Sequence, residues 1–329
     1  MSCSPCHFAT RVRNVIVEAQ TLGLLSENSL LTGYSGKCVI ALLQRLCDAF
    51  TDQNRCYLEI GVFQGMTLLH AAPHCKSEAY GIDNFAFFDP EGKNKSLVLS
   101  RMEQSGINNA ILINQDYEDA LEQLHQYLQG KKIGVYFVDG PHDYRSQLMC
   151  LQLVLPHLAT DAVIVIDDCN YRHVRLATSD FLRTHPEFAM VYESYTQAHP
   201  HNLSGHASEN AVNGWWNGIH VLIKTPGIRG SSLPQTTRSR VVYENEHLTQ
   251  TVRFPLLMIQ TSRLLIDLYK GQWYKFFKRS LWIRKQTKES NHEWVGKYDF
   301  MNTYSENLEE RFHDVSKHDP LDNETHPHP

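Results

Sequence analysis

The chain has 329 residues, of which 42% are hydrophobic, 20% charged and 10% aromatic. This composition is typical of an ordinary folded protein and excludes the collagenous, disordered and membrane-spanning classes. The formal net charge of -5 gives no reason to expect a nucleic-acid partner, because neutralising phosphates requires a basic surface.

The first part of the chain is predicted to be helical, and a run of short strands follows it. From about residue 8 to 50, apolar side chains recur at helical spacing, and in residues 38–50 they lie along one stripe. After residue 50, short apolar runs alternate with helical stretches. The runs cover residues 56–61, 78–83, 110–116, 133–139 and 162–168. Short strands separated by long helical connections predict a parallel sheet with right-handed crossovers.

The alternation ends after the fifth run. Two further strand-like runs, 188–195 and 214–224, are joined by a polar connection in which no helix is predicted. They predict an antiparallel hairpin at the end of the sheet. The expected fold class is therefore α/β, with a Rossmann-like, doubly wound, seven-stranded sheet that is mostly parallel, plus a helical C-terminal extension.

The sequence divides into three predicted parts. Residues 1–34 form an N-terminal helical segment, residues 35–225 a catalytic domain, and residues 226–329 a linker, a basic and aromatic helical extension and an acidic tail. Residues 253–288 have three open roles: a lid, a homodimer contact, or a peripheral contact with an anionic membrane surface. Solvated cations around a packed apolar stripe are the simplest interpretation of this segment.

The cysteines indicate the cellular compartment. Eight are scattered through the chain, mostly within apolar segments, which predicts free thiols in a reducing compartment rather than a disulfide framework. The start of the sequence has no continuous apolar stretch of the kind found in signal peptides, and no run is long enough for a transmembrane helix. A cytoplasmic protein is therefore expected.

Acidic residues stand at or next to the ends of all five predicted parallel strands. The carboxyl ends of parallel strands share one edge of the sheet, where ligands bind in open α/β folds. One aspartate at a strand end is commonly a helix cap, but an acid at every end indicates a ligand with cations, hydroxyls or amines. The acidic residues are Glu59, Asp83, Asp116, Asp139, Asp167 and Asp168.

The turn after the first strand contains Gly61, Phe63 and Gly65. It is not a dinucleotide-binding turn, because Phe63 replaces the glycine that lets the backbone approach a pyrophosphate. Two glycines at this looser spacing suit a cofactor without phosphates. Asp83 ends the second strand, where its carboxylate is placed to accept hydrogen bonds from ribose hydroxyls.

Four stretches resemble a known family: "YLEIGVFQGMT", "YGIDNF", "YFVDGPHDYRSQLMCLQLVLPHL" and "AVIVIDD". Over residues 35–224 the chain is similar to class I S-adenosylmethionine-dependent methyltransferases, and most similar to metal-dependent small-molecule O-methyltransferases of the macrocin and catechol type. The resemblance implies that Glu59, Phe63 and the two glycines of the turn border the cofactor. It also implies that Asp83 holds the ribose and that Asp116 lies near the adenine.

The same resemblance implies a divalent-metal site formed by Asp139, Asp167 and Asp168. A physical argument supports it, because three carboxylates at two adjacent strand ends cannot all stay ionised without a cation. Oxygen ligands select a hard ion, with Mg²⁺ the first candidate. Capping of the following helix remains the rival role for Asp167 and Asp168. Either His142 or Asp139 could accept a substrate proton.

The sequence therefore predicts a Mg²⁺-dependent O-methyltransferase that acts on a hydroxyl of a sugar, polyol or catechol-like compound. Residues 84–95 and 196–213 are expected to shape the substrate pocket. Two alternatives stay open. One is a metal-dependent hydroxylase or hydrolase on the same fold. The other is a non-catalytic scaffold that works through its C-terminal helix.

Overall fold

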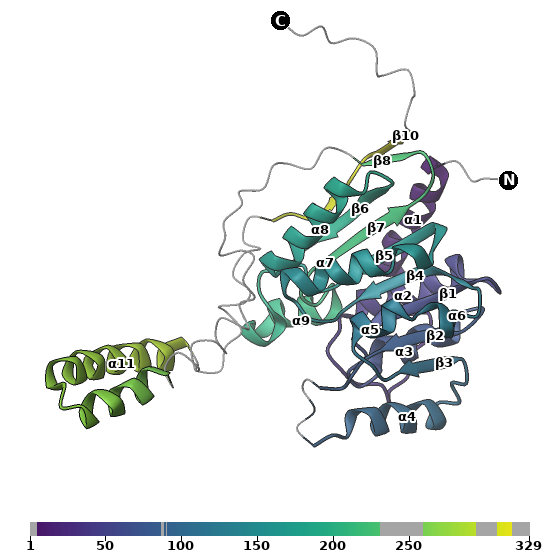
Figure 1. Ribbon diagram of the computed structural model, residues 1–329. Coiled ribbons are helices and arrows are strands. Elements are labelled where there is room, and N and C mark those ends of the chain that lie inside the picture. The colour runs from purple at the N-terminus through teal and green to yellow at the C-terminus, as the bar shows by residue number, and fades with distance from the viewer. Residues whose placement is uncertain (1–4, 87–88, 90, 231–258, 294–307, 318–329) are drawn as a thin grey trace, which may run out of the picture.

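A computed structural model describes residues 5–86, 89, 91–230, 259–293 and 308–317 (Figure 1). The chain begins with helices α1 (Pro5–Leu22) and α2 (Lys37–Phe50). The apolar face of α1, which includes Val12 and Ile16, is buried in the same core cluster as Leu42 and Leu46 of α2. Helix α1 thus contributes to the core, and residues 23–36 between the two helices are not helical.

The central sheet confirms the predicted fold class. Five parallel strands are followed by an antiparallel strand pair, in the order β3-β2-β1-β4-β5-β7-β6-β9. The first seven strands in the chain are β1 (Arg55–Ile60), β2 (Ala79–Ile82), β3 (Ala110–Ile113), β4 (Lys132–Val138), β5 (Leu158–Ile166), β6 (Phe188–Ser194) and β7 (Ile219–Lys224).

Helices cover both faces of the sheet. Alternate residues of β4 enter two different core clusters, Phe137 on one face and Tyr136 on the other. Helices α1 to α4 supply side chains to the first cluster and α5 to α8 to the second. The connecting helices are α3 (Met66–Ala71), η1 (Ala72–His74), α4 (Asn94–Gln104), α5 (Tyr117–Glu122), α6 (His125–Leu128), α7 (Tyr144–Leu153), η2 (Leu155–His157) and α8 (Arg172–Thr184).

The connection between β6 and β7 differs from the prediction. It contains the 3-10 helix η3 (Pro200–Asn202) and the helix α9 (Gly205–Asn213), where no helix was expected. Only Ala211 of α9 is buried, so this helix has no apolar stripe from which it could be predicted. Strand β7 is also shorter than the predicted run, because residues 214–218 form a turn with positive φ at Trp216 and Gly218.

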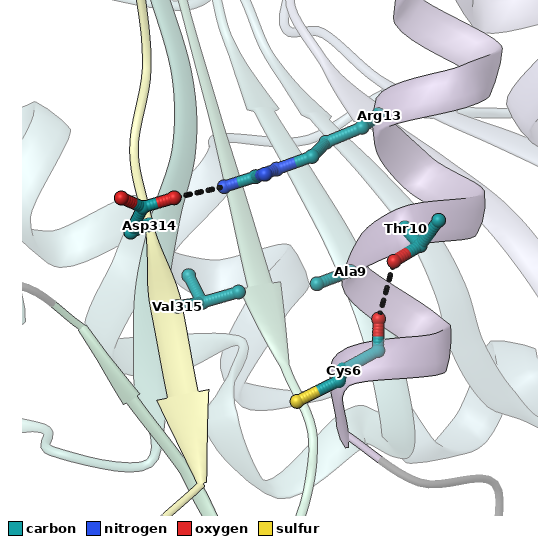
Figure 2. A pocket seen from close by; sticks show the side chains of 6 residues that line it. All are labelled: Cys6, Ala9, Thr10, Arg13, Asp314 and Val315. Carbon is teal, nitrogen blue, oxygen red and sulfur yellow. Dashed lines mark hydrogen bonds and ion pairs between the residues drawn. The ribbon is translucent and has the colours of Figure 1, made fainter.

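A C-terminal segment returns to the sheet, which the sequence did not indicate. Strand β9 (Arg311–Phe312) pairs with β6 as an eighth strand, and β10 (Val315–Lys317) pairs with β8 (Ile228–Gly230). Figure 2 shows Arg13 of α1 reaching Asp314 across a small cleft, with 3.6 Å between Nη2 and Oδ1. Arg13 also donates to the carbonyl of His313. Two residues with exposed side chains carry no recognisable strand pattern, so β9 could not be predicted.

The predicted helical extension is confirmed in the part of the chain that the structure describes. Residues 259–269 are helical, and α11 spans Trp273–Glu293. The predicted linker from residue 231 and most of the acidic tail lie outside the described residues. Within the described ranges, every cysteine is a free thiol, and no helix has the length and apolar character needed to cross a membrane.

Candidate active site

The candidate site lies at the carboxyl ends of β1 and β4, where the strand order reverses. Strand β1 pairs with β2 on one side and β4 on the other, so this is the topological switch point at which open α/β sheets bind ligands. The turns after the two strands touch. A Cβ at Gly61, whose φ is +88°, would lie 1.9 Å from the carbonyl oxygen of Asp139. Only glycine fits there.

Asp83 organises the turn after β1. Its Oδ2 accepts backbone hydrogen bonds from Val62 at 2.9 Å and Phe63 at 2.7 Å, and its Oδ1 accepts one from Phe85 at 2.7 Å. A carboxylate has about four acceptor positions, so these bonds leave room for one more. Asp83 thus fixes the shape of the turn, and these three bonds leave one of its acceptor positions unused.

Glu59 is buried in β1 beneath the turn. The Tyr57 hydroxyl donates to its Oε2 at 2.6 Å, and the Thr67 hydroxyl donates to its Oε1 at 3.2 Å. Burial raises the pKa of Glu59 to about 8, and the nearby Asp139 and Asp83 carboxylates add to the rise. At neutral pH this side chain is therefore largely a neutral carboxylic acid, which can donate as well as accept a hydrogen bond.

Two acidic residues near the strand ends serve as ordinary helix caps. Asp116 is exposed and accepts the backbone N–H of Glu118 at the start of α5. Asp143 accepts the backbone N–H of Ser146 at the start of α7. An aspartate in this position satisfies an otherwise unpaired amide of the first helical turn, so the contacts of Asp116 are explained without a cofactor.

The other acidic residues gather around His142. Ligand atoms of Asp139, His142 and Asp168 all lie within 4.8 Å of one another, and we call these residues the carboxylate–histidine cluster. The Nε2 atom of His142 is 2.6 Å from Oδ2 of Asp168 and 3.9 Å from Oδ1 of Asp139. The His142 ring stacks on Tyr171 with 5.0 Å between centroids, which fixes its orientation above the strand ends.

The ionisable groups of this cluster change one another's pKa values. Burial raises the pKa of Asp139 to about 7, and Asp168 adds to the rise. Burial alone would lower the pKa of His142, but the Asp168 and Asp139 charges outweigh it and raise the pKa to about 10. The pKa of Asp168 is lowered despite burial, because His142 and Asn217 stabilise its charged form. Without a bound cation, His142 and Asp168 form an ion pair.

Asp167 lies beside the cluster rather than in it. Its Oδ1 accepts the backbone N–H of Asp168 at 2.9 Å, and its side chain is buried. Burial, reinforced by the Asp139 and Asp168 charges, raises its pKa well above the ordinary value. Asp167 and Asp168 do not cap the following helix α8. This helix begins after Tyr171 and has no side-chain cap.

The donor set fits a divalent cation. Asp139, His142 and Asp168 offer two carboxylates and one imidazole. The buried Asp167 is a further carboxyl group with a raised pKa, and a nearby cation would stabilise its charged form. Asn217 donates to Oδ1 of Asp168 at 2.5 Å, and its own Oδ1 is a buried acceptor without a hydrogen-bond partner. A nitrogen ligand among oxygens favours a transition ion, whereas Mg²⁺ prefers oxygen ligands alone.

An aromatic group lies next to this edge, and the sequence did not indicate it as a unit. Tyr34 stacks on Phe63 with centroids 5.4 Å apart and on Trp216 at 6.1 Å, and His199 meets Trp216 edge-on at 6.0 Å. Burial lowers the pKa of His199 to about 4, while the Asp168 charge acts in the opposite direction. Phe63 and Trp216 both have positive φ, a strained conformation that is often found at functional sites.

Comparisons with known proteins agree with this fold. Residues 58–169, from β1 to just beyond β5, match a family model described as "Methyltransferase domain". No curated protein matches the chain. Similar solved structures include the O-methyltransferase TomG from Streptomyces achromogenes, with 16% identity, 66% of this chain and 98% of that chain covered, and a TM-score of 0.45.

Two further similar structures are enzymes with different described activities. An O-methyltransferase from Bacillus cereus has 14% identity, covers 66% of this chain and 90% of that chain, and gives a TM-score of 0.42. An rRNA methylase from Streptococcus thermophilus has 15% identity, with 56% and 95% covered and a TM-score of 0.39. Likeness at this level does not assign a substrate.

The family match identifies a methyltransferase domain over residues 58–169, on the mostly parallel sheet with an antiparallel end that the sequence predicted. The chain is therefore a methyltransferase, as the resemblance predicted.

Proposed function

We propose that the chain transfers a methyl group from S-adenosylmethionine to a hydroxyl of a small molecule, with a divalent cation at the carboxylate–histidine cluster. The observation that carries the proposal is the cluster itself: Asp139, His142 and Asp168 meet at the switch point, next to the turn at Gly61. Methyl transfer needs a deprotonated acceptor oxygen, and this is the place in the described structure where charge and proton acceptors converge.

The proposed cofactor site is the turn after β1. Gly61, Phe63 and Gly65, with Glu59 beneath them, would border the methionine part, and the remaining acceptor position of Asp83 would take a ribose hydroxyl. Asp116 stays in the proposal as a neighbour of the adenine because it is exposed at the end of the adjacent strand. S-adenosylmethionine supplies the methyl group on a positively charged sulfur.

Asp139 and Asp168 would hold the cation, with His142 or Asp167 completing its ligands, and Mg²⁺ remains the first candidate. A cation there would lower the pKa of the acceptor hydroxyl. The acceptor oxygen would give its proton to Asp139, or to His142 in its neutral form, and would bond to the methyl carbon as the carbon–sulfur bond breaks. Orientation of the acceptor by the fixed strand ends would supply much of the rate.

We propose a small hydroxylated acceptor, such as a sugar, polyol or catechol-like compound, rather than a nucleic acid. The formal charge of -5 gives the chain no general attraction for a phosphate backbone. The aromatic group formed by Tyr34, Phe63 and Trp216 offers flat apolar surface next to the cluster, which suits a ring-shaped acceptor. Residues 35–225 would form the catalytic domain.

The test begins with the cofactor. Calorimetry of the purified chain with S-adenosylmethionine should give one binding site, and Asp83→Ala should weaken the affinity by about tenfold or more, since the variant loses the acceptor that shapes the turn. Methyl transfer to a panel of sugars, polyols and catechols should require a divalent cation and stop in EDTA. Absence of cofactor binding would contradict the whole proposal. Methyl transfer that continues in EDTA would contradict only the requirement for a cation.

The two candidate proton acceptors can be separated by substitution. Asp139→Asn should lower both divalent-cation binding and turnover if Asp139 is a ligand. His142→Gln should leave cofactor binding intact. If His142 is the base, this variant lowers kcat and retains cation affinity. If it is a ligand, cation affinity falls in parallel with turnover.

A further inference from the structure

The helical extension contains a compact unit, residues 259–285, which we call the helix pair. Residues 259–269 and α11 are joined by a turn at Gly271, whose φ is +64°. The Nε atom of Arg279 donates to Oδ2 of Asp267 at 2.8 Å, and its Nη1 donates to Gln260. The backbone N–H of Gln272 closes the turn on the carbonyl of Asp267 at 2.8 Å.

The charge of the helix pair is strongly one-sided. It contains seven cationic side chains and a single carboxylate, Asp267. Asp267 is only 7% exposed, and Arg279 already pairs with it. The outer surface is therefore cationic, unlike the chain as a whole. The cations are Arg263, Lys270, Lys275, Lys278, Arg279, Arg284 and Lys285.

Large apolar side chains lie among these cations with their surfaces exposed. Trp273, Phe277 and Leu281 are 58%, 61% and 67% exposed, and their spacing of four residues places them on one stripe of α11. Tyr269 and Tyr274, at the turn, are 91% and 80% exposed. Phe276, which lies beside this stripe, is partly buried. Such a stripe of apolar surface among cations is typical of an interfacial helix.

We propose that the helix pair binds the surface of an anionic lipid bilayer, with its apolar stripe at the level of the headgroups. Trp and Tyr prefer this interface, and each Lys or Arg near it gains about 1 kcal/mol from anionic lipid. The aliphatic surface of Leu265, Ile266 and Leu281 distinguishes the partner from RNA, because bases stack on planar groups. Docking onto a second copy through this same face would bring two cationic surfaces together.

The experiment is cosedimentation of the full chain with lipid vesicles. We expect binding to vesicles that contain about one third phosphatidylglycerol and not to pure phosphatidylcholine, with weakening at high salt. The triple variant Lys275→Gln, Lys278→Gln, Lys285→Gln should bind about 100-fold more weakly. The variant Trp273→Ala, Phe277→Ala, Leu281→Ala should lose binding even at low salt.

A matched control removes exposed apolar side chains elsewhere. Leu22 and Leu30 are 69% and 48% exposed, and their double alanine variant should bind vesicles like the unaltered chain. Circular dichroism and S-adenosylmethionine binding should be the same in all variants, which separates loss of the surface from loss of the fold. Equal binding to both vesicle types, or binding to RNA or to a second copy with none to vesicles, would overturn the proposal.

Discussion

The two halves of the sheet's ligand-binding edge treat their acidic residues differently. On the half formed by β1 to β3, Asp83 and Asp116 accept backbone N–H groups at 2.7–2.9 Å. On the half formed by β4 and β5, Asp139 and Asp168 surround His142, and Asp167 is buried beside them. In the first half, carboxylates fix the shape of the backbone. In the second half, ionisable groups are crowded together, and their opposite charges cancel only partly.

This difference indicates a division of labour. A carboxylate that accepts several backbone hydrogen bonds is fixed and satisfied, which suits a turn that must present one surface to a cofactor. Carboxylates crowded in a buried place are costly without a cation or a proton, and natural proteins keep such arrangements mostly at functional sites. The methyl donor would therefore lie on the first half and the acceptor chemistry on the second.

The largest expected effect comes from the second half. Asp168→Asn and Asp139→Asn should each lower methyl transfer by about 10²–10⁴-fold, while S-adenosylmethionine binding stays within about threefold. Asparagine keeps the shape of the side chain. Asp139→Asn removes a carboxyl whose charged form is unfavourable in the fold, so thermal unfolding of this variant should not shift downward at neutral pH. Asp168→Asn breaks the ion pair with His142, so its unfolding temperature should fall. Near-normal turnover in both variants would show that the two halves do not differ in function.

The second prediction concerns the place where the halves touch. Gly61→Ala should destabilise the fold by about 3 kcal/mol or more, because alanine is strained at positive φ and its Cβ would meet the Asp139 carbonyl oxygen. Urea unfolding measures this loss. Gly92→Ala is a matched control with φ of +66° and no atom within 4 Å of the added Cβ. Similar losses in both variants would mean that φ alone, and not the contact between the halves, sets the cost.

The third prediction is a pH dependence in the first half. The pKa of folded Glu59 is about 8, above its ordinary value of 4.5. Its contribution to stability is therefore full below about pH 4.5 and declines as the pH rises towards about 8, because only the unfolded carboxyl ionises in that window. Glu59→Gln can keep the bonds to Tyr57 and Thr67, so it should remove this decline.

Urea unfolding at two pH values measures the effect. The variant should gain about 2 kcal/mol relative to the unaltered chain between about pH 5 and about pH 7. The Asp116→Asn variant, changed at an exposed acid of the same half, should follow the unaltered chain. A parallel pH profile in the Glu59→Gln variant would mean that Glu59 is ionised in the fold.

The smallest expected effect belongs to Asp143, which is adjacent to His142 in sequence but caps α7. Asp143→Ala should cost about 1 kcal/mol of stability through the lost cap. Methyl transfer should be unchanged once the variant is folded. A loss of turnover comparable to that of Asp168→Asn would contradict this assignment. It would mean that Asp143 takes part in methyl transfer and does not only cap α7.

Much of the fold could be predicted from the sequence, because buried parallel strands are continuous apolar runs and each ends in a visible polar residue. Helix α9 and strand β9 could not. The first has a single buried residue, Ala211, and the second contains only two residues with exposed side chains. Strand β9 is held by tertiary contacts, such as the nearby bond from Arg13 to the carbonyl of His313, which leave no periodic pattern.

The candidate site could be located but not resolved from the sequence. Strand ends placed Asp139, Asp167 and Asp168 together, and His142 was found by its position after Asp139. The sequence could not separate the capping role of Asp116 from a ligand role, since both need a carboxylate at a strand end. Asn217 was missed altogether, because it reaches Asp168 from a turn that lies far along the chain.

The central claim is most directly tested by calorimetric titration of a divalent cation, Mg²⁺ or Mn²⁺, into the chain saturated with S-adenosylmethionine. The account predicts one cation site per chain that is lost in Asp139→Asn and Asp168→Asn and retained in Asp143→Ala. Absence of cation binding, or binding that survives both of the first two substitutions, would contradict the assignment of the cluster as the chemical half of the site.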